Sequence, residues 1–377
     1  MVRVGGYQQY NASVVDKILT VKPHSYAKKT RAMLAVFEEA KTLNIRSVAD
    51  VGACTGLMGL LARTTLSNIS KVVHYEHDNN YIDVTRKVYA FLEEQGSRTC
   101  SLDIVQGTIT PKTPAPSADM VLGLAIMHWL YSATAAFGSI DLIVEWFARH
   151  RPKMLVLEWI SPKDGPASCH IKKNRKVATS AYTHAHFLTA VNRRFADVVP
   201  IEYGRPHRVL YKLTRPIFDW KRKNGSTARC WISYSTGRVV KQVHGFLEHG
   251  VVDREVFWLK KLNGSGLAPE LIAVADSTII MTYVGEPLSS SNVPKDADAQ
   301  IRTINSRFLE LGLEHNDWRQ NAMVLGQKIT MIDFQWASLR GDFSCGGRVA
   351  PTPDNKKPDN IQEVELLLKL PFVAATK

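Results

Sequence analysis

The chain has 377 residues, and its 45% hydrophobic and 22% charged content is that of an ordinary globular protein with room for two domains. The net charge of +13 and the pI near 9.5 favour an anionic partner: nucleic acid, a phosphorylated glycan, a nucleotide or an anionic membrane face. Five scattered cysteines without a C-x-x-C pair argue against a zinc site or a disulfide framework, and no apolar run approaches the roughly 20 residues that span a bilayer. We therefore expect a soluble, cytoplasmic protein without a signal peptide or a transmembrane segment, and its oligomeric state is not indicated.

The first 25 residues are polar and mixed. Residues 5–10 (GGYQQY) are compatible with a lid over a bound ligand and equally with a frayed terminus. Residues 26–43 carry apolar side chains at helical spacing, which predicts a helix that leads into the first strand.

Residues 47–62 (SVADVGACTGLMGLLA) contain a short apolar strand with Asp50 near its end, a glycine-rich turn and an apolar helix from Leu57. A strand, a tight glycine turn and a helix N-terminus form a cradle for a small charged or nucleoside ligand. We expect Gly52 and Gly56 to let the backbone approach this ligand, because a Cβ at either position would strike it. An ordinary βα turn can have the same G-x-x-x-G spacing, so the turn alone leaves both interpretations open.

A second apolar strand at residues 71–76 ends in Glu76, whose carboxylate can accept hydrogen bonds from both ribose hydroxyls of a nucleoside cofactor. An amphipathic helix is predicted at residues 80–94. Three more strands are predicted at residues 102–107, 119–124 and 153–159, with a proline-rich loop at residues 110–117. This alternation of strands and helices predicts a mostly parallel α/β sheet.

Two side chains follow these strands at the edge where parallel α/β sheets place their chemistry. His128 comes just after the fourth strand and is a candidate general base, because its free pKa lies near neutrality. Packing under Trp129 is the structural alternative for this histidine. Glu158, at the end of the fifth strand, is a second candidate base or else a solvated strand terminus.

Residues 182–195 then predict a helix, and residues 196–202 and 208–213 predict an antiparallel pair of strands, so the first domain ends near Arg215. The element order, with the glycine motif, the acid after strand two and the segment after strand four, resembles class I S-adenosylmethionine-dependent methyltransferases. The fold of that family also ends in an antiparallel hairpin. The NAD pattern G-x-G-x-x-G is not met.

This resemblance implies a Rossmann-like α/β domain over residues 1–215 that binds S-adenosylmethionine. The residues that it assigns to the cofactor are Asp50, Gly52, Ala53, Gly56, Glu76 and Asp119.

The chain after residue 216 has a different pattern. Two β-rich runs are joined by a turn, and the second, VVKQV, carries Lys241. A helix at residues 254–262 carries Glu255. The other predicted elements are two strands within residues 271–284, a helix at residues 298–311, an exposed loop at residues 341–360 and a closing helix at residues 361–370.

Two further stretches, EHNDWRQN and MIDFQWA, carry groups suited to phosphoryl transfer, which needs a carboxylate near the acceptor hydroxyl and oxygen ligands for Mg²⁺. Asp317, Asn321 and Asp333 supply such a set. Lys241 supplies a cation for the nucleotide phosphates, and Glu255 is placed to hold that lysine.

This half of the chain resembles the protein-kinase-like fold, in particular its small atypical members that phosphorylate sugars and antibiotics. The resemblance implies an α+β domain over residues 216–377 that binds ATP and Mg²⁺, with a hinge for adenine at residues 281–286. The roles that it implies are Asp317 as catalytic base, Asn321 and Asp333 as Mg²⁺ ligands, and Lys241 with Glu255 at the phosphates.

The sequence departs from that pattern at three places. The spacing from Asp317 to Asn321 is one residue short, Gln335 replaces a glycine, and no glycine-rich loop of the G-x-G-x-x-G type precedes Lys241. An active kinase and an inactive kinase-like module both remain open.

The order of the two domains resembles bacterial bifunctional enzymes that cap polysaccharide chains by phosphorylating and then methylating the terminal sugar. This resemblance implies a bifunctional transferase that acts on an anionic phosphoglycan. The alternative from another class is a cap-type RNA methyltransferase whose second domain is an inactive basic platform. Basic runs at residues 172–176 and 221–223 suit this alternative, although each is short enough to be a solvated loop. A scaffolding protein with two vestigial sites is the third interpretation.

Overall fold

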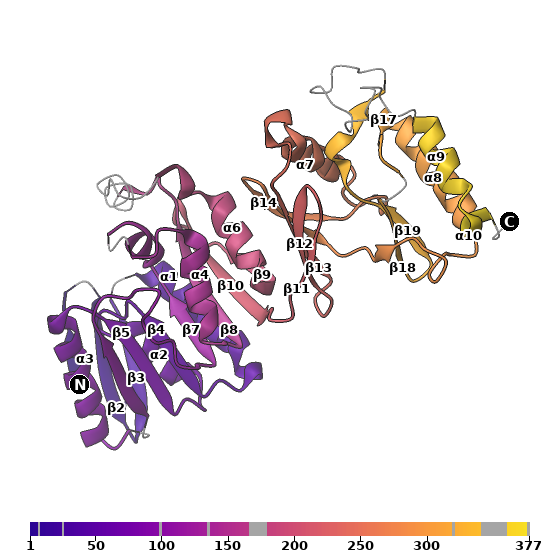
Figure 1. Cartoon of the computed structure of the whole chain (residues 1–377). Coiled ribbons are helices and arrows are strands. Elements are labelled where there is room, and N and C mark those ends of the chain that lie inside the picture. The colour runs from indigo at the N-terminus through magenta and orange to yellow at the C-terminus, as the bar shows by residue number, and fades with distance from the viewer. Residues whose placement is uncertain are drawn as a thin grey trace. The chain divides into compact units, whose positions relative to one another are not determined.

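The computed structural model describes residues 1–6, 8–24, 26–97, 100–133, 136–165, 179–318, 321–340 and 360–374. It divides into two compact units, Met1–Ile217 and Phe218–Lys377 (Figure 1). The predicted boundary at residue 215 lies two residues before this division. Within the described ranges, no helix combines the length and the apolar character needed to cross a bilayer.

The first unit is built on one sheet, and its strands are β4 (Ser47–Val51), β5 (Lys71–Glu76), β6 (Ser101–Gln106), β7 (Met120–Gly123), β8 (Met154–Ile160), β9 (Phe195–Ile201) and β10 (Arg208–Pro216). Their order in the sheet is β6-β5-β4-β7-β8-β10-β9. Strands β4 to β8 are parallel, whereas β10 runs antiparallel to both β8 and β9. The prediction of a Rossmann-like, mostly parallel sheet with an antiparallel closing pair is confirmed.

Helices cover both faces of this sheet, because its strands carry apolar side chains on both sides. Ala49 and Val51 belong to a core shared with α4 (Ile140–Arg149) and α6 (His184–Asn192). Val48 belongs to a second core with the helices α1 (Ala27–Ala40), α2 (Leu57–Thr65) and α3 (Asn79–Glu94). Shorter helical turns are η1 (Lys41–Leu43), the π-helix η2 (Trp129–Ala133) and η3 (Thr179–Ala181). Because both faces are covered, a ligand site is expected at the carboxyl ends of the parallel strands.

The N-terminus forms an antiparallel sheet of β1 (Val2–Val4), β2 (Tyr10–Val15) and β3 (Ile18–Pro23). Tyr10 and Ala12, two residues apart on one face of β2, are fully buried in the second core. Asp16 and Lys17 have φ of 50° and 64° and form the two-residue turn that matches the twist of a tight hairpin. Within residues 5–10, Tyr10 is therefore held in the core, whereas Gly5, Gly6, Gln8 and Gln9 lie between β1 and β2.

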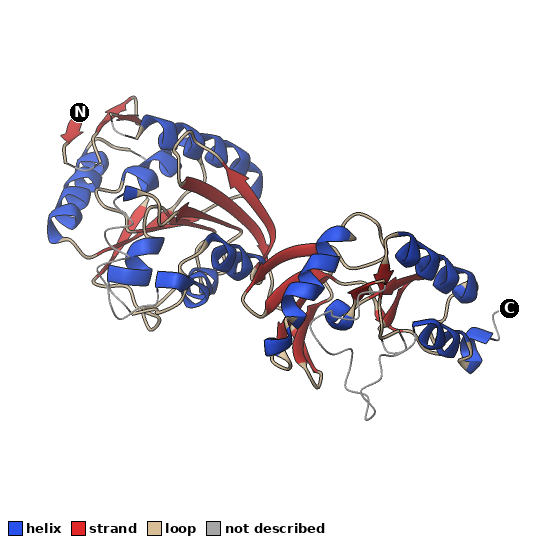
Figure 2. Cartoon of the chain, turned by 90° about the horizontal axis from the view of Figure 1, so that it is seen from above, coloured by secondary structure: helices blue, strands red, loops and turns tan. Residues whose placement is uncertain are grey.

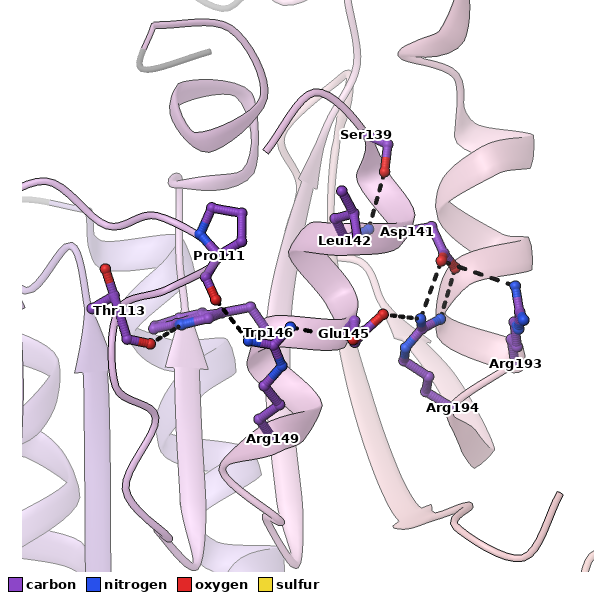
Figure 3. Close-up of polar contacts among 10 residues, drawn as sticks. All are labelled: Pro111, Thr113, Ser139, Asp141, Leu142, Glu145, Trp146, Arg149, Arg193 and Arg194. Carbon is purple, nitrogen blue, oxygen red and sulfur yellow. Dashed lines mark hydrogen bonds and ion pairs between the residues drawn. The ribbon is translucent and has the colours of Figure 1, made fainter. Parts of the chain in front are cut away.

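The predicted proline-rich loop is held against α4 (Figure 3). The indole Nε1 of Trp146 donates a hydrogen bond to the carbonyl oxygen of Thr113 at 2.9 Å. On the same helix, Asp141 accepts two hydrogen bonds from Arg194 at 2.7 and 3.1 Å, which joins α4 to the segment between α6 and β9. The loop thus enters β7 from a defined position.

The second unit begins with a five-stranded antiparallel sheet, and its strands are β11 (Lys221–Asn224), β12 (Ala228–Ser233), β13 (Arg238–Val243), β14 (Leu271–Ala275) and β15 (Thr278–Thr282). Their order is β11-β12-β13-β15-β14, with strands in red in Figure 2. The basic run at residues 221–223, predicted as a loop, lies on the exposed edge strand β11. The other basic run, at residues 172–176, lies outside the described residues.

The remaining elements of this unit pack into one core that includes α7 (Val251–Lys261), α8 (Ala297–Glu310) and α9 (Asn360–Leu368). Its smaller elements are β16 (Glu286–Pro287), β17 (Leu313–Glu314), β18 (Ala322–Leu325), β19 (Lys328–Met331), β20 (Ser338–Leu339), α10 (Pro371–Ala374), η4 (Leu247–His249) and η5 (Phe334–Trp336). Strands β16, β18 and β19 form one small sheet, and β17 pairs with β20. Residues 341–359 of the predicted loop lie outside the described residues.

Candidate functional site

The turn between β4 and α2 wraps over the end of β5. The amides of Gly52 and Ala53 both donate to the carbonyl oxygen of Tyr75, at 2.9 and 3.2 Å. Gly52 and Gly56 have φ of 72° and 79°, and Cys54 between them has φ of 52°, a left-handed conformation that side chains other than glycine rarely adopt. The predicted strand, glycine turn and helix are thus assembled at the carboxyl end of the parallel strands.

The glycines of this turn meet neighbours from the chain itself. A Cβ at Gly52 would lie 2.9 Å from Cδ1 of Ile126, and one at Gly56 would lie 2.7 Å from Cε1 of His74. A Cβ at Gly59, in the first turn of α2, would lie 2.6 Å from Nε2 of His74. We expected a Cβ at Gly52 or Gly56 to strike a ligand, but the structure shows that it would already strike Ile126 or His74 of the chain itself.

His74 was not predicted, since it lies inside an apolar run with no distinguishing signal. It is 1% exposed, and within the described part of the chain neither ring nitrogen has a hydrogen-bond partner. Burial lowers its pKa to about 4, so the ring is neutral at physiological pH.

Asp50 is 3% exposed and accepts a hydrogen bond from the Gly59 amide at 3.2 Å. Burial raises the pKa of its carboxyl to about 7; the hydrogen bond from Gly59 opposes the rise, and the charge of Glu76 adds to it. Asp50 therefore fixes the start of α2 relative to β4.

Glu76 lies beside the glycine turn at the end of β5 and is 7% exposed. Its Oε2 accepts from the Cys54 amide at 2.8 Å, and its Oε1 accepts from the amides of His77 and Asp78 at 2.8 and 3.0 Å. Nδ1 of His77 also lies 3.1 Å from Oε1. A carboxylate has about four lone-pair sites, so these contacts orient both oxygens and leave Oε2, which among the described residues accepts only from Cys54, with a site for a further donor. The arrangement suits a ligand that presents hydroxyl donors, such as a ribose.

The N-terminal segment contacts the same turn. Tyr10 OH donates to the carbonyl oxygen of Thr55 at 2.6 Å. Gln8 Oε1 accepts from Thr55 Oγ1 at 3.1 Å and from the amide of Leu57, the first residue of α2, at 3.2 Å. We call residues Gln8 to Val15 the strap. The strap lies on the turn, and a lid over a bound ligand at residues 5–10 stays a prediction; Tyr7 lies outside the described residues.

His128 lies past the end of β7, immediately before η2, and is 5% exposed. Its ring centroid is 5.8 Å from that of Trp129, with the planes tilted by 47°. Ser132 Oγ donates to the His128 carbonyl oxygen at 2.5 Å. The structure thus puts His128 at the edge where it was expected, packed against Trp129, and both interpretations of this residue remain.

Glu158 is fully buried, so the alternative of a solvated strand terminus is wrong. Lys29 Nζ lies 2.6 Å from its Oε2, and Tyr203 OH donates to its Oε1. Arg208 NH1 lies 3.7 Å away, while Arg208 also makes two hydrogen bonds to Asp164. α1 and β10 therefore cover the end of β8 and engage this carboxylate in a buried ion cluster.

Asp119 is not brought to the glycine turn. It precedes β7, and its Oδ2 accepts from the amides of Arg46 and Ser47 at 2.8 and 3.2 Å, while Lys153 Nζ lies 3.0 Å from its Oδ1. Gly52 follows β4, and β4 and β7 are parallel, so the two residues lie at opposite edges of the sheet. Asp119 instead joins the starts of three strands.

In the second unit, Lys241 of β13 reaches two acids from separate elements. Its Nζ lies 2.8 Å from each carboxylate oxygen of Glu255 on α7 and 2.8 Å from Oδ1 of Asp333. Burial alone would lower the pKa of Lys241, but Asp333 and Glu255 outweigh it and raise that pKa above its ordinary value. The three predicted residues are thus assembled, and the lysine is charged.

Asp333 follows β19 with φ of 62° and ψ of 65°, a left-handed conformation that a non-glycine residue keeps only where its surroundings impose it. Arg254, next to Glu255 on α7, donates to the carbonyl oxygen of Gln335 at 2.6 Å. This contact, which was not predicted, ties α7 to the segment just after Asp333.

The loop with Asp317 is tied to the residue before Asp333. His315 Nε2 donates to the Ile332 carbonyl oxygen at 2.8 Å, and the Ile332 amide donates to the Asn321 carbonyl oxygen at 2.9 Å. The Asn321 side chain donates to the Asp317 carbonyl oxygen at 3.0 Å. In the part of the chain that the structure describes, no three His, Cys, Asp or Glu side chains form a metal-binding group.

The predicted hinge at residues 281–286 packs closely on β18. Gly285 has φ of 114°, and a Cβ there would lie 1.9 Å from the Val324 carbonyl oxygen. Glu286 accepts hydrogen bonds from Tyr283 at 2.8 Å, Tyr234 at 3.0 Å and Lys223 at 2.7 Å. Residues 281–286 are thereby joined to β11 and to the turn after β12.

Comparisons with solved structures return methyltransferases. They include an O-methyltransferase family protein from Burkholderia thailandensis (15% identity, TM-score 0.37), magnesium protoporphyrin IX methyltransferase from Synechocystis with bound SAH (13%, 0.34) and an O-methyltransferase from Bacillus cereus with SAH (10%, 0.35). Each comparison covers 50% of this chain and, respectively, 56%, 84% and 81% of the other. This chain thus spans little more than half of the Burkholderia protein. No family profile and no curated protein matches the sequence.

Proposed function

We propose that the first unit is an S-adenosylmethionine-dependent methyltransferase. The observation that carries the proposal is Glu76, whose two oxygens are oriented beside the glycine turn by three backbone amides. A fixed acceptor for ribose hydroxyls next to a tight turn suits an adenosine cofactor. Asp50 supports the turn through Gly59, and Tyr10 and Gln8 cover it.

S-adenosylmethionine supplies an electrophilic methyl group when it is bound. The contribution of the chain is alignment of an acceptor oxygen and exclusion of water, which together account for most of such a transfer. A phosphate oxygen is already ionised at neutral pH and needs no base. A hydroxyl acceptor needs a proton acceptor, and His128 at the end of β7 is our candidate for that role.

We further propose that the second unit binds Mg·ATP and phosphorylates a sugar or glycan end. The observation that carries this proposal is the Lys241–Glu255–Asp333 cluster, in which a buried lysine meets acids from two elements. One cation with two carboxylates has a net negative charge, which suits a divalent ion. Lys241 would contact the phosphates, Asp333 and Asn321 would hold Mg²⁺, and Asp317 would accept the hydroxyl proton.

The net charge of +13 favours an anionic acceptor, and we favour a phosphoglycan. RNA as the methyl acceptor, with the second unit as an inactive platform, is the second candidate. Lys221 and Arg222 on the exposed strand β11 support it, with Lys221 Nζ lying 5.4 Å from the Tyr234 ring centroid.

Calorimetric titration of the full chain tests both proposals. We expect S-adenosylhomocysteine to bind the wild type and Glu94→Gln, an exposed control on α3, but to bind Glu76→Gln at least about tenfold more weakly, because a charged acceptor is lost. We expect Mg·ATP to bind the wild type and the exposed control Glu310→Ala but not Asp333→Ala. An unchanged affinity of Glu76→Gln overturns the first proposal. A wild type that binds no Mg·ATP overturns the second, and salt-dependent RNA binding then favours the platform.

A further inference from the structure

Gln8 on the strap is oriented by two donors. The Leu57 amide lies 3.2 Å from its Oε1, and Thr55 Oγ1 lies 3.1 Å from the same atom. A backbone N–H can only donate, so the atom of the Gln8 amide group that faces Leu57 must be the oxygen. The NH₂ group of Gln8 is therefore the outward end of this amide.

The Gln8 Nε2 has two N–H donors and no hydrogen-bond partner among the residues that the structure describes. The side chain is neither fully exposed nor fully buried. It contacts Thr55 within the glycine turn and Leu57, the first residue of α2, directly after that turn. A ligand group that accepts hydrogen bonds would satisfy these donors at the turn.

The charges around the turn decide which part of a ligand lies there. Glu76, on the β5 side of the turn, accepts from Cys54 and would repel a second carboxylate. Gln8, on the α2 side, presents donors and carries no charge. A molecule with a diol at one end and a carboxylate at the other is therefore best accommodated with its diol at Glu76 and its carboxylate at Gln8.

We infer that Gln8 is a specificity-determining residue that donates, through its Nε2, to the amino-acid carboxylate of the methyl donor. This inference rests on the proposed methyltransferase function. It assigns to the strap the recognition of the amino-acid part of the cofactor, as distinct from its adenosine part.

The rest of the strap supports this role. Tyr10 is fully buried and holds Thr55 through its hydroxyl group at 2.6 Å, so the strap is attached to the turn two residues beyond Gln8. The β2–β3 hairpin then connects the strap to the second core. Gln8 is thus fixed in place before any ligand arrives, which reduces the entropy lost on binding.

The experiment compares two ligands that differ in the amino-acid part. S-adenosylhomocysteine has the carboxylate, whereas 5′-methylthioadenosine retains adenosine and the thioether but lacks it. Both are titrated calorimetrically into the full-length wild type, Gln8→Ala, Gln8→Glu and the control Gln9→Ala, whose side chain is exposed. Gln8→Glu keeps an oxygen acceptor for Leu57 and Thr55 and so preserves the strap contacts, but it replaces the outward NH₂ by a negative oxygen.

We expect S-adenosylhomocysteine to bind Gln8→Ala about tenfold more weakly than the wild type, and Gln8→Glu more weakly still, because a hydrogen bond to a charged group is lost and then replaced by repulsion. The affinity for 5′-methylthioadenosine should change less than about twofold in all variants. Equal losses for both ligands, or no loss for either, overturn the inference. A wild type that binds neither ligand overturns the methyltransferase proposal itself, which is a separate result.

Discussion

Lys241 and Glu255 form a closed pair in which the ammonium nitrogen is 2.8 Å from both oxygens of one carboxylate. The third contact of the ammonium group is Asp333 Oδ1, also at 2.8 Å. All three N–H donors of Lys241 therefore face carboxylates. The side chains of Lys241 and Glu255 are 7% and 1% exposed, whereas that of Asp333 is 27% exposed, so Asp333 is the member that a ligand can reach.

Removal of Lys241 alone should destabilise the second unit strongly. Lys241→Met leaves Glu255 buried without its cation, which typically costs about 3–5 kcal/mol. The double variant Lys241→Met/Glu255→Leu removes both charges and should regain most of this loss. Hydrogen exchange of β13 and α7 in the full chain measures the effect locally. Equal protection in the single variant and the wild type would show that the pair does not stabilise this unit.

The effect of Gly59→Ala on stability should change sign when the His74 side chain is removed. Gly59 lies in a helix, where alanine is favoured by about 1 kcal/mol. In the wild type, however, the new Cβ would lie 2.6 Å from His74 Nε2, and overpacking of this kind costs about 1–3 kcal/mol. We expect Gly59→Ala to destabilise the wild type and to stabilise His74→Ala. Urea unfolding of the four proteins gives the coupling energy, and strict additivity would contradict the packing described.

Gly285 should not accept a side chain. Alanine there combines φ of 114° with a Cβ 1.9 Å from the Val324 carbonyl oxygen, so the segment around Gly285 must move off β18. We expect a loss of at least about 3 kcal/mol in the second unit. Gly264→Ala is the matched control, because Gly264 also has positive φ, 75°, but no atom within 4 Å of the new Cβ. It should cost only about 1–2 kcal/mol. Similar losses in the two variants, measured by thermal unfolding, would show that the contact with β18 is unimportant.

The stability of the first unit should depend on pH through Asp50. Burial raises the pKa of this carboxyl to about 7 from an ordinary value of 3.8, so between these values the folded state binds more protons than the unfolded state. The contribution to stability is complete below pH 4, falls as the pH rises toward 7, and is lost above it, at about 1.4 kcal/mol for each pKa unit. Asp50→Asn keeps an acceptor for Gly59 and does not titrate. The free energy of unfolding of the wild type minus that of this variant should therefore fall from pH 4 to pH 7, because only the wild type loses stability through this group. A difference that stays constant over this range would show that Asp50 does not titrate there.

Much of the first unit could be predicted from short contiguous stretches of sequence. The strand, glycine turn and helix around Gly52, and the acid at Glu76, are contiguous signals with a defined spacing, so the sequence was sufficient to predict them. Lys241, Glu255 and Asp333 lie far apart in sequence and were grouped only through a resemblance, and the structure brings them into contact.

Other features depend on contacts that a linear pattern does not contain. The closing strand β10 and helix α1 contribute to the burial of Glu158, which lies two residues before the end of β8, whereas the sequence left a candidate base and a solvated strand terminus open. Asp119 was assigned to the wrong edge of the sheet. It was grouped with the residues that follow β7, although it lies before the first residue of that strand. The contact of Gln8 with α2 joins residues 49 positions apart, and the short polar segment around it shows no periodicity.

Both backbone groups of Ile332 form hydrogen bonds to one loop. Its carbonyl oxygen accepts from His315 Nε2, and its amide donates to the Asn321 carbonyl oxygen. Asp317 lies between those two residues, and Asp333 is the next residue after Ile332. One of these contacts joins main-chain atoms and the other uses the His315 side chain, so neither involves the side chain of Asp317 or Asp333. Exchange of Asp317, or exchange of Asp333 for a residue such as asparagine that tolerates the left-handed backbone there, would change the chemistry at that position and leave these two contacts in place, so the two positions can be redesigned one at a time.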